Sequence, residues 1–295
     1  MRVSLPRVHP ADLRQRLQNI AGERHPFSGR FHLARVENYI EEEFKRFGLT
    51  VESDPFTYRG NSYRNIVAHG GPLSRLRSGG ESKGQGLIIL GAHFDSVQGS
   101  AGADDNASGV AVLLEAARIL SAFNVRPAVL FCAFNLEEMN MIGSTNFAKR
   151  LKATGAKVAA MICLEMVGFT DARPGSQRYP TGLGWFYPDR GNFIGLIANW
   201  RSAFLLRRFA RSMKQVPGLP VETLNVLGNG FLIPQVRLSD HAPFWDLGYP
   251  ALLVTDTAFF RNPHYHNFSD TPETLDFGFM SRVCQGVVAG VLNLL

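Results

Sequence analysis

Histidines and acidic residues stand at the ends of apolar runs along this chain, where they could bind metal ions. His93 follows LIILGA, Glu138 follows AVLFCAFNLE, and Glu165 closes VAAMICLE. His266 lies in the segment after ALLVTDT. Imidazole and carboxylate ligands without thiolates suit zinc and, less selectively, cobalt or manganese. The residue types therefore predict a metal centre.

Two aspartates add to this pattern. Asp95 lies two residues after His93, a spacing that lets its carboxylate fix the tautomer of the imidazole without binding metal itself. Asp105 lies in GADDNASG, a tight polar turn before a predicted helix over 109–123. The small residues of this turn allow Asp105 to approach a metal closely. Its carboxylate could bridge two ions, because each oxygen can bind one of them.

The adjacent pair Glu137-Glu138 directly follows an apolar run. Two neighbouring acidic side chains cannot easily both face one metal ion. One glutamate as a ligand and the other as a general base gives each a distinct role. The unliganded glutamate would take a proton from water and pass it to the departing amine.

Each of these patterns also occurs in proteins without a metal. His93 and Asp95 could form a surface pair, and adjacent acids after a strand often begin a helix, where the helix dipole favours them. Glu165 and His266, taken singly, fit structural roles. Their occurrence together, in order and at successive strand ends, favours the metal centre.

The elements that position these residues follow a regular alternation from residue 87 onward. Short apolar runs (LIILGAH, AVLFCAFN, VAAMICLEM and ALLVTDT) alternate with predicted helices over 109–123, 144–154 and 200–214. Fully apolar strands alternating with helices indicate a mostly parallel sheet covered on both faces. Open sheets of this kind form their binding crevice at the carboxyl ends of the strands. All the strand-end residues above would meet there.

The remaining segments complete one predicted domain over 1–295. The first 48 residues indicate two helices, the second over about 32–47, and two extended segments follow. A Gly/Ser-rich stretch at about 71–86 predicts a flexible link, and the last residues, from Glu273, predict a closing helix. An irregular segment at about 170–192 is longer than a plain connector, which is typical of functional loops. We expect it to border the crevice.

The composition excludes several classes of protein. A hydrophobic content of 45% with 19% charged residues is ordinary for a globular chain, and no stretch approaches the roughly 20 apolar residues of a membrane helix. The three cysteines lie in apolar runs without paired spacing, which predicts buried thiols. The net charge of +6 includes basic residues over 201–214. They predict a solvated helix face, opposite an apolar face with Phe204, Leu205 and Phe209, and no nucleic-acid partner.

The amino terminus carries basic residues but no apolar core of the roughly 7–15 residues that a signal peptide requires. We therefore expect a cytoplasmic protein. A trimmed or misassigned start would give the same pattern and leave secretion open. Oligomeric state cannot be read from this chain.

Taken together, the motifs resemble those of the M28 family of zinc peptidases. They occur in family order over residues 91–276, as GAHFDS, GADDNASG, FNLEEMNMIGS, SDHAPFW and PHYHNFSDTPETLD. The resemblance implies a single phosphorylase/hydrolase-like α/β domain of the zinc-exopeptidase type, with a central mixed sheet. It also implies two zinc ions per chain and hydrolysis of peptide bonds, most often by removal of amino-terminal residues.

The resemblance assigns the site residues one by one. One zinc would be held by His93, Asp105 and Glu165, and the other by Asp105, Glu138 and His266. Glu137 would be the general base that activates a metal-bridging water, and Asp95 would orient His93. A cis peptide bond is expected between Asp105 and Asn106.

Two features depart from the pattern of many relatives. Glu165 stands where many have aspartate, so its extra methylene could shift that metal or change its occupancy. The tyrosine that some relatives carry shortly before SDH is absent from PQVRL, whereas Tyr265 directly precedes His266. Tyr265 is therefore the candidate for stabilising the oxyanion, with a packing role as the alternative.

Other functions stay open at this point. A glutaminyl cyclase-like enzyme would hold one zinc, although the presence of His93 argues against it. A non-catalytic scaffold would usually have lost ligands or the base. Among peptidases, a carboxypeptidase or dipeptidase could use Arg237 or Arg261 to bind a free carboxylate, but either arginine could equally form a surface salt bridge.

Overall fold

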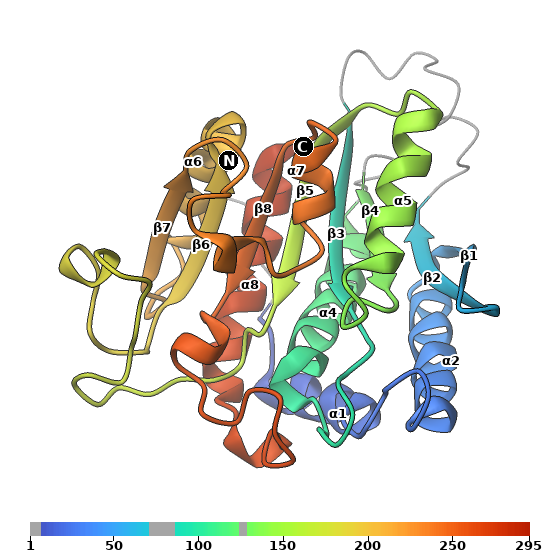
Figure 1. Ribbon diagram of the computed structural model, residues 1–295, viewed down its shortest axis with the longest axis horizontal. Helices are drawn as coiled ribbons and strands as arrows, with labels where there is room; N and C mark the ends of the chain where they lie inside the picture. The colour runs from blue at the N-terminus through green and yellow to red at the C-terminus, as the bar shows by residue number, and fades with distance from the viewer. Residues whose placement is uncertain (1–6, 71–85, 124–128) are drawn as a thin grey trace.

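The computed structural model describes residues 7–70, 86–123 and 129–295. The predicted link at 71–86 therefore lies outside the described residues except for Gly86. Within the described chain, eight strands form one mixed sheet in the order β1-β2-β4-β3-β5-β8-β6-β7, with helices on both faces (Figure 1). The strands are β1 Thr50–Tyr58, β2 Asn61–His69, β3 Leu87–His93, β4 Val129–Phe134, β5 Val158–Glu165, β6 Ile194–Asn199, β7 Val221–Val226 and β8 Ala251–Thr255.

The helices divide between the two faces of the sheet (Figure 1). Their bounds are α1 Pro10–Ile20, α2 Arg30–Arg46, α4 Gly109–Ala122, α5 Ile142–Ala153, α6 Ala203–Met213, α7 Ala242–Asp246 and α8 Phe277–Leu294. The larger core packs α1, α2, α4, α6 and α8 against one face. The smaller core packs α5 and α7 against the other.

The central strands explain why both faces are covered. Every residue of β3 is buried, and its side chains alternate between the two cores. Ile88 and Leu90 belong to the larger core, whereas Leu87 and Ile89 belong to the smaller one. Because strand side chains point alternately to opposite faces, a continuous apolar run requires cover on both sides. The predicted α/β class with a mixed central sheet is confirmed.

The parallel centre places four strand ends at one edge of the sheet. β4, β3, β5 and β8 run parallel to their neighbours in that order. On one flank, β2 pairs antiparallel with β4 and β1 pairs antiparallel with β2. On the other, β6 pairs antiparallel with β8 and parallel with β7. The crevice predicted at the carboxyl ends is therefore bordered by two antiparallel flanks.

Sequence patterns missed β6 and β7. β7 is half-exposed along most of its length, because it is the edge strand next to β6, and its sequence VETLNV lacks an apolar run. The closing helix begins at Phe277, four residues later than predicted, and the Asp276 side chain accepts the N–H of Phe279 at its start. The predicted helices over 109–123 and 144–154 are confirmed as α4 and α5.

The prediction of buried thiols is confirmed within the described residues. All three cysteines are free and buried. The basic residues of α6 lie on its exposed side, opposite the buried Leu205 and Phe209, although Phe204, expected on the apolar face, is exposed. Among the described helices, α8 has the length and apolar composition of a membrane span, but most of it is buried against α1, α4 and α6 as a core helix.

Candidate metal centre

The five predicted ligands come together at the carboxyl ends of the parallel strands. His93 is the last residue of β3 and Glu165 the last of β5. Asp105 lies in the turn that leads into α4, Glu138 follows β4, and His266 lies in the long segment after β8. His93 and His266, which are 173 positions apart in the sequence, are thus brought to the same edge of the sheet.

The geometry of this cluster centres on Asp105. Its Oδ1 atom lies 3.3 Å from Nε2 of His93, which in turn lies 3.3 Å from Oε2 of Glu165. Its Oδ2 atom lies 3.1 Å from Nε2 of His266, which lies 3.4 Å from Oε2 of Glu138. Two groups of three potential ligands therefore share Asp105, one through each oxygen. In each group the ligand atoms lie within 4.8 Å of one another.

The donor set fits metal ions. Nε2 of His93 and Oε1 of Glu138 are buried and have no hydrogen-bond partner among the described residues, which is a costly arrangement for a polar atom unless a ligand satisfies it. Three carboxylates also crowd into this space. Burial and the neighbouring Asp105 carboxylate raise the pKa of Glu138 to about 7. A cation between these oxygens would relieve their repulsion.

The pKa values of the two histidines are raised as well, because the carboxylates stabilise the charged imidazolium. Burial lowers the pKa of His266, but hydrogen bonds to Asp105 and Glu138 outweigh it and raise that pKa to about 10. The same carboxylates that favour an imidazolium would favour a divalent cation in its place. Metal binding at this site would therefore displace protons.

Asp95 supports the cluster in a way that the sequence did not indicate. Its Oδ1 and Oδ2 atoms accept the backbone N–H groups of Glu137 and Glu138, at 3.0 and 3.1 Å. Nδ1 of His93 lies 3.2 Å from the main-chain oxygen of Asp95 and 3.5 Å from Oδ1. Asp95 thus joins the end of β3 to the turn after β4, in addition to lying behind His93.

The turn that carries Asp105 is held from both sides. The carboxylate of Asp270 accepts the N–H groups of Asp104 and Asp105, at 2.8 and 3.1 Å. The Asn106 side chain donates to the carbonyl of Leu164 at 2.9 Å, directly before the ligand Glu165. The expected cis peptide bond between Asp105 and Asn106 is present. Asp270 and Asn106 lie inside the motifs but were not predicted as site residues.

Ser239 is a further supporting residue that sequence reasoning missed. Its hydroxyl donates to Oε2 of Glu165 at 2.6 Å, and it lies 3.2 Å from the Cys163 sulfur. Ser239 belongs to the SDHAPFW motif, which was the only signal available. The side chain of Glu165 thereby has a fixed hydrogen-bond partner.

Glu137 lies beside the ligands and is half-buried. A carboxylate oxygen of Glu137 lies within 4.8 Å of the ligand atoms of His93 and Glu138. Burial, opposed by His93 and reinforced by Glu138 and Glu165, raises the pKa of Glu137 well above its usual range. A raised pKa suits a group that must take up a proton and release it again.

Tyr265 stacks on the ligand His266, with ring centroids 3.7 Å apart and planes 17° apart. It also packs against Phe259, at 5.4 Å between centroids. These contacts give the tyrosine the packing role that was its alternative. Its proposed contact with an oxyanion stays a prediction.

Both arginines suggested as carboxylate readers have hydrogen-bond partners in the described chain, although Nη2 of Arg261 has none there. Arg261 is buried and donates to Gln177 Oε1 and to the carbonyls of Phe169 and Phe193. Arg237 donates to the carbonyl of Asn229 and to Asp246. The salt-bridge interpretation is correct for Arg237, whereas Arg261 is a buried structural residue.

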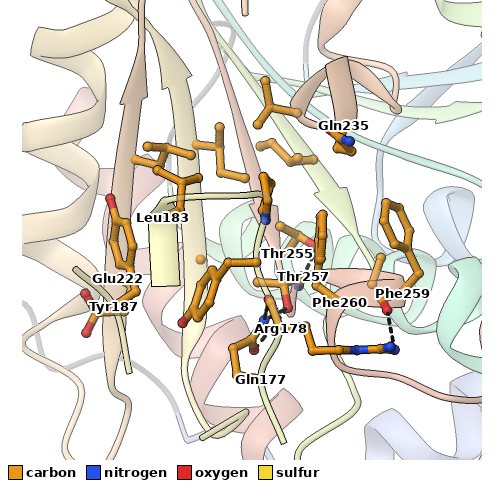
Figure 2. Close-up of a pocket in the computed structure, with 18 of the residues that line it drawn as sticks. Gln177, Arg178, Leu183, Tyr187, Glu222, Gln235, Thr255, Thr257, Phe259 and Phe260 are labelled. Atoms are coloured by element: carbon orange, nitrogen blue, oxygen red, sulfur yellow. Dashed lines mark hydrogen bonds between the residues drawn. The ribbon is translucent and has the colours of Figure 1, made fainter. Parts of the chain in front are cut away.

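A pocket opens beside the metal centre (Figure 2). Glu165 and Tyr265 line it on the metal side, and its volume is about 110 Å³. Its walls are mainly apolar and come from β6, β7, β8 and neighbouring loops: Leu183, Leu196, Ile197, Leu224, Leu253 and Phe259.

One wall of this pocket comes from the segment at 170–192, which was predicted to border the crevice. Tyr187 donates to the carbonyl of Thr223 at 2.9 Å and stacks on Tyr179, with centroids 5.7 Å apart. In Figure 2, Leu183 and Tyr187 lie on the side of the pocket toward Glu222. Trp185 and Phe186 are exposed, so they do not belong to this wall.

Comparison with known proteins places these observations in a family. The model of peptidase family M28 matches residues 75–291. Protein YfbL of Escherichia coli K12 is 35% identical over 304 residues, covering 98% of this chain and 90% of that protein. A probable leucine aminopeptidase of Arthroderma otae is 30% identical over 207 residues. That match covers 65% of this chain and 49% of the relative, so the chain spans about half the length of this relative.

Solved structures share the fold. The LapA aminopeptidase of Legionella pneumophila superimposes with a TM-score of 0.74 at 19% identity, over 97% of this chain and 72% of that one. A glutaminyl cyclase of Porphyromonas gingivalis gives 0.70 at 18% identity, over 97% and 99% of the two chains. At these identities the likeness concerns the fold alone. Because the family model covers residues 75–291, the chain belongs to peptidase family M28, as its motifs predicted.

Proposed function

We propose that this protein is a two-zinc exopeptidase that removes amino-terminal residues from peptides. The observation that carries the proposal is the position of Asp105, whose two oxygens face different histidines at 3.3 and 3.1 Å. A carboxylate in that position can serve two ions at once. His93 and Glu165 would complete one ligand set, and Glu138 and His266 the other.

The bound zinc ions would polarise the scissile carbonyl and lower the pKa of the attacking water. The remaining chemistry falls to side chains of this protein. Glu137 would accept the proton of that water and then donate it to the departing amine. Asp95 would hold the Glu137 backbone through its hydrogen bond of 3.0 Å. Tyr265 would donate a hydrogen bond to the carbonyl oxygen as negative charge develops on it.

The preference for the amino-terminal end rests on a named relative and on the partners of two arginines. One relative of this chain is named a probable leucine aminopeptidase. Arg237 and Arg261, the two arginines considered for a terminal carboxylate, are held by other partners. An amino-terminal substrate therefore complements the described site better than a carboxyl-terminal one.

The pocket beside Glu165 and Tyr265 would take the side chain of the residue that is removed. Its walls are apolar and its volume is about 110 Å³. An engineered apolar cavity of about 150 Å³ accommodates benzene, with its six carbons. By proportion, this pocket suits about four heavy atoms, the size of a leucine, isoleucine or methionine side chain. Such a preference agrees with the name of the Arthroderma otae relative.

Digestion of a mixed peptide library by zinc-loaded protein, read by mass spectrometry, tests the proposal. We expect successive loss of single amino-terminal residues, which amino-terminal acetylation blocks. Loss from the carboxyl end would overturn the proposed specificity. Loss of ammonia from amino-terminal glutamine, with one zinc per chain, would instead establish a cyclase. Two bound zinc ions with no change in any peptide would mean that the site is right and the substrate class wrong, whereas failure to bind zinc would favour a non-catalytic scaffold.

A further inference from the structure

Arg24 lies in the segment between α1 and α2, before the residues that the family model matches. Its side chain is fully buried, with 0% exposure. This segment runs beside the loop between β3 and α4 (Figure 1), and that loop carries Asp95 and Asp105. A hydrogen bond of 2.8 Å from the N–H of Gly22 to the carbonyl of Ala101 joins the two segments. The amino-terminal helices thus reach the base of the metal centre.

The guanidinium of Arg24 contacts backbone carbonyls. Nε donates to the carbonyl of Phe94 at 2.7 Å, and Nη2 donates to that of Gly102 at 2.8 Å. Nη1 lies within donating distance of the carbonyls of Ile20, Gly22 and Ala101, at 3.1, 2.6 and 2.9 Å. The backbone N–H of Arg24 donates to Ser96 Oγ at 2.8 Å. The planar fork of an arginine can bind several acceptors in fixed directions, which a lysine cannot.

Two of these carbonyls belong to the ligand-bearing turns. Phe94 stands between His93 and Asp95, and Gly102 stands three residues before Asp105. One guanidinium therefore joins the end of β3 to the turn that carries the shared ligand. The fit is close, since a Cβ on Gly102, which has φ +56°, would lie 2.6 Å from Nη2 of Arg24. Any shift of the guanidinium would be transmitted to both turns.

Charge adds to this geometry. The acidic groups whose charges act on Arg24 include Asp270, Asp105, Asp95 and Glu138. A buried cation beside this group offsets part of the repulsion among the carboxylates. Within the described chain, the hydrogen bonds of the Arg24 guanidinium all go to backbone carbonyls, so the ligand oxygens stay available for metal.

We propose that Arg24 is a positioning residue of the metal centre, which fixes the His93–Asp95 turn relative to the Gly102–Asp105 turn. The inference rests on the proposed two-zinc site. Arg24 contacts neither substrate nor metal in this arrangement and acts through the backbone of the two turns. Its loss should therefore weaken metal binding and change the ligand geometry, beyond any loss of global stability.

Arg16 provides a matched control, because it is a second buried arginine of the amino-terminal segment. It pairs with Glu43 and, at 3.2 Å, with Glu115, both outside the metal centre. The full chain would be prepared as wild type, Arg24→Lys and Arg16→Lys, and each would be shown to be folded by circular dichroism at the assay temperature. Zinc affinity would be measured by competition with a chromophoric chelator, and ligand geometry by the visible spectrum of the cobalt-loaded protein.

We expect Arg24→Lys to weaken zinc binding about 10- to 100-fold, as losses of residues that orient ligands do, and to alter the cobalt spectrum. Arg16→Lys should lower the thermal midpoint while leaving zinc affinity within about twofold. Equal zinc affinity and identical cobalt spectra for wild type and Arg24→Lys would overturn the inference. If Arg24→Lys does not fold, Ser96→Ala, which removes the partner of the Arg24 backbone, decides the matter. Weakened zinc binding in Ser96→Ala supports the inference, and unchanged binding overturns it.

A wild-type chain that binds no zinc would instead refute the proposed function. Amide hydrogen exchange of the metal-free protein then still tests Arg24. Faster exchange over residues 94–105 in Arg24→Lys, but not in Arg16→Lys, would support the positioning role. Equal exchange in both variants would refute it.

Discussion

The hydroxyl of Ser239 donates a 2.6 Å hydrogen bond to Oε2 of Glu165, the same oxygen that lies 3.3 Å from Nε2 of His93. The family resemblance of the motifs leads one to expect a shorter aspartate at the position of Glu165. The serine therefore gives the longer side chain a fixed end point, and the ligand oxygen a fixed direction. Hydrogen bonds to a charged group are about twice as strong as neutral ones.

Removing this hydroxyl should loosen one of the two metal sites. In Ser239→Ala we expect the affinity for one zinc ion of the pair to fall about 10-fold or more, while the other ion binds as before. Glu165→Asp should have a similar effect, because the shorter carboxylate withdraws from Ser239. Stepwise zinc titration of the metal-free protein measures both. Two ions bound with wild-type affinity in Ser239→Ala would contradict the role given to the serine.

Glu137→Gln should separate catalysis from metal binding. The amide keeps the shape of the side chain but cannot take up a proton, so kcat should fall about 10²- to 10⁴-fold. Zinc content should be unchanged, because the ligands are other residues. Glu42→Gln, at an exposed position of α2, is the control and should keep wild-type turnover. Near-normal turnover of Glu137→Gln on its best substrate would exclude Glu137 as the base.

The size of the pocket should set the side-chain preference. Leu183 contributes to the wall formed by the segment at 170–192, so Leu183→Ala should admit larger residues. We expect the ratio of kcat/KM for phenylalanyl over leucyl substrates to rise about tenfold, since one methylene in such a pocket is worth about 1–3 kcal/mol. Leu232→Ala, at an exposed leucine that does not line the pocket, should leave the ratio unchanged. An unchanged ratio in Leu183→Ala would show that the side chain binds elsewhere.

His241 makes stability depend on pH. Its ring is fully buried, lies 4.4 Å from the Trp245 ring between centroids, and has Nε2 2.8 Å from the carbonyl of Val236. Burial is the main cause that lowers the pKa of His241 to about 4. The unfolded chain takes up a proton near pH 6.5, whereas the folded chain does so only near pH 4. The contribution of neutral His241 to the free energy of unfolding is therefore fully present above pH 6.5, and it is lost as the pH falls toward 4.

Between pH 6.5 and pH 4, protonation of His241 should lower the free energy of unfolding by about 3 kcal/mol. Urea unfolding of wild type and His241→Gln at pH 7.5 and 4.5 measures it. We expect the free energy of unfolding of wild type, relative to the variant, to fall by most of that amount between the two pH values. A difference that stays constant with pH would show that the folded protein binds the proton as readily as the unfolded chain does.

Local patterns in the sequence were sufficient for much of this architecture. The apolar runs that became β3, β4, β5 and β8 predicted buried parallel strands, and the carboxyl ends of such strands must meet at one edge. The order of the motifs along the chain therefore predicted that His93, Glu138, Glu165 and His266 would lie together. β7 was missed because an edge strand with a half-exposed face has no continuous apolar run.

The arrangement within the cluster was decided by tertiary structure alone. Which oxygen of Asp105 faces which histidine, and which carbonyls Arg24 binds, depend on contacts between residues far apart in the chain. Asp95 accepts N–H groups 42 and 43 residues away, and Arg24 donates to carbonyls 70 and 78 residues away. Periodicity and spacing report which residues are buried and which elements they form. The partner of a buried polar group is set by packing between elements, which no local pattern records.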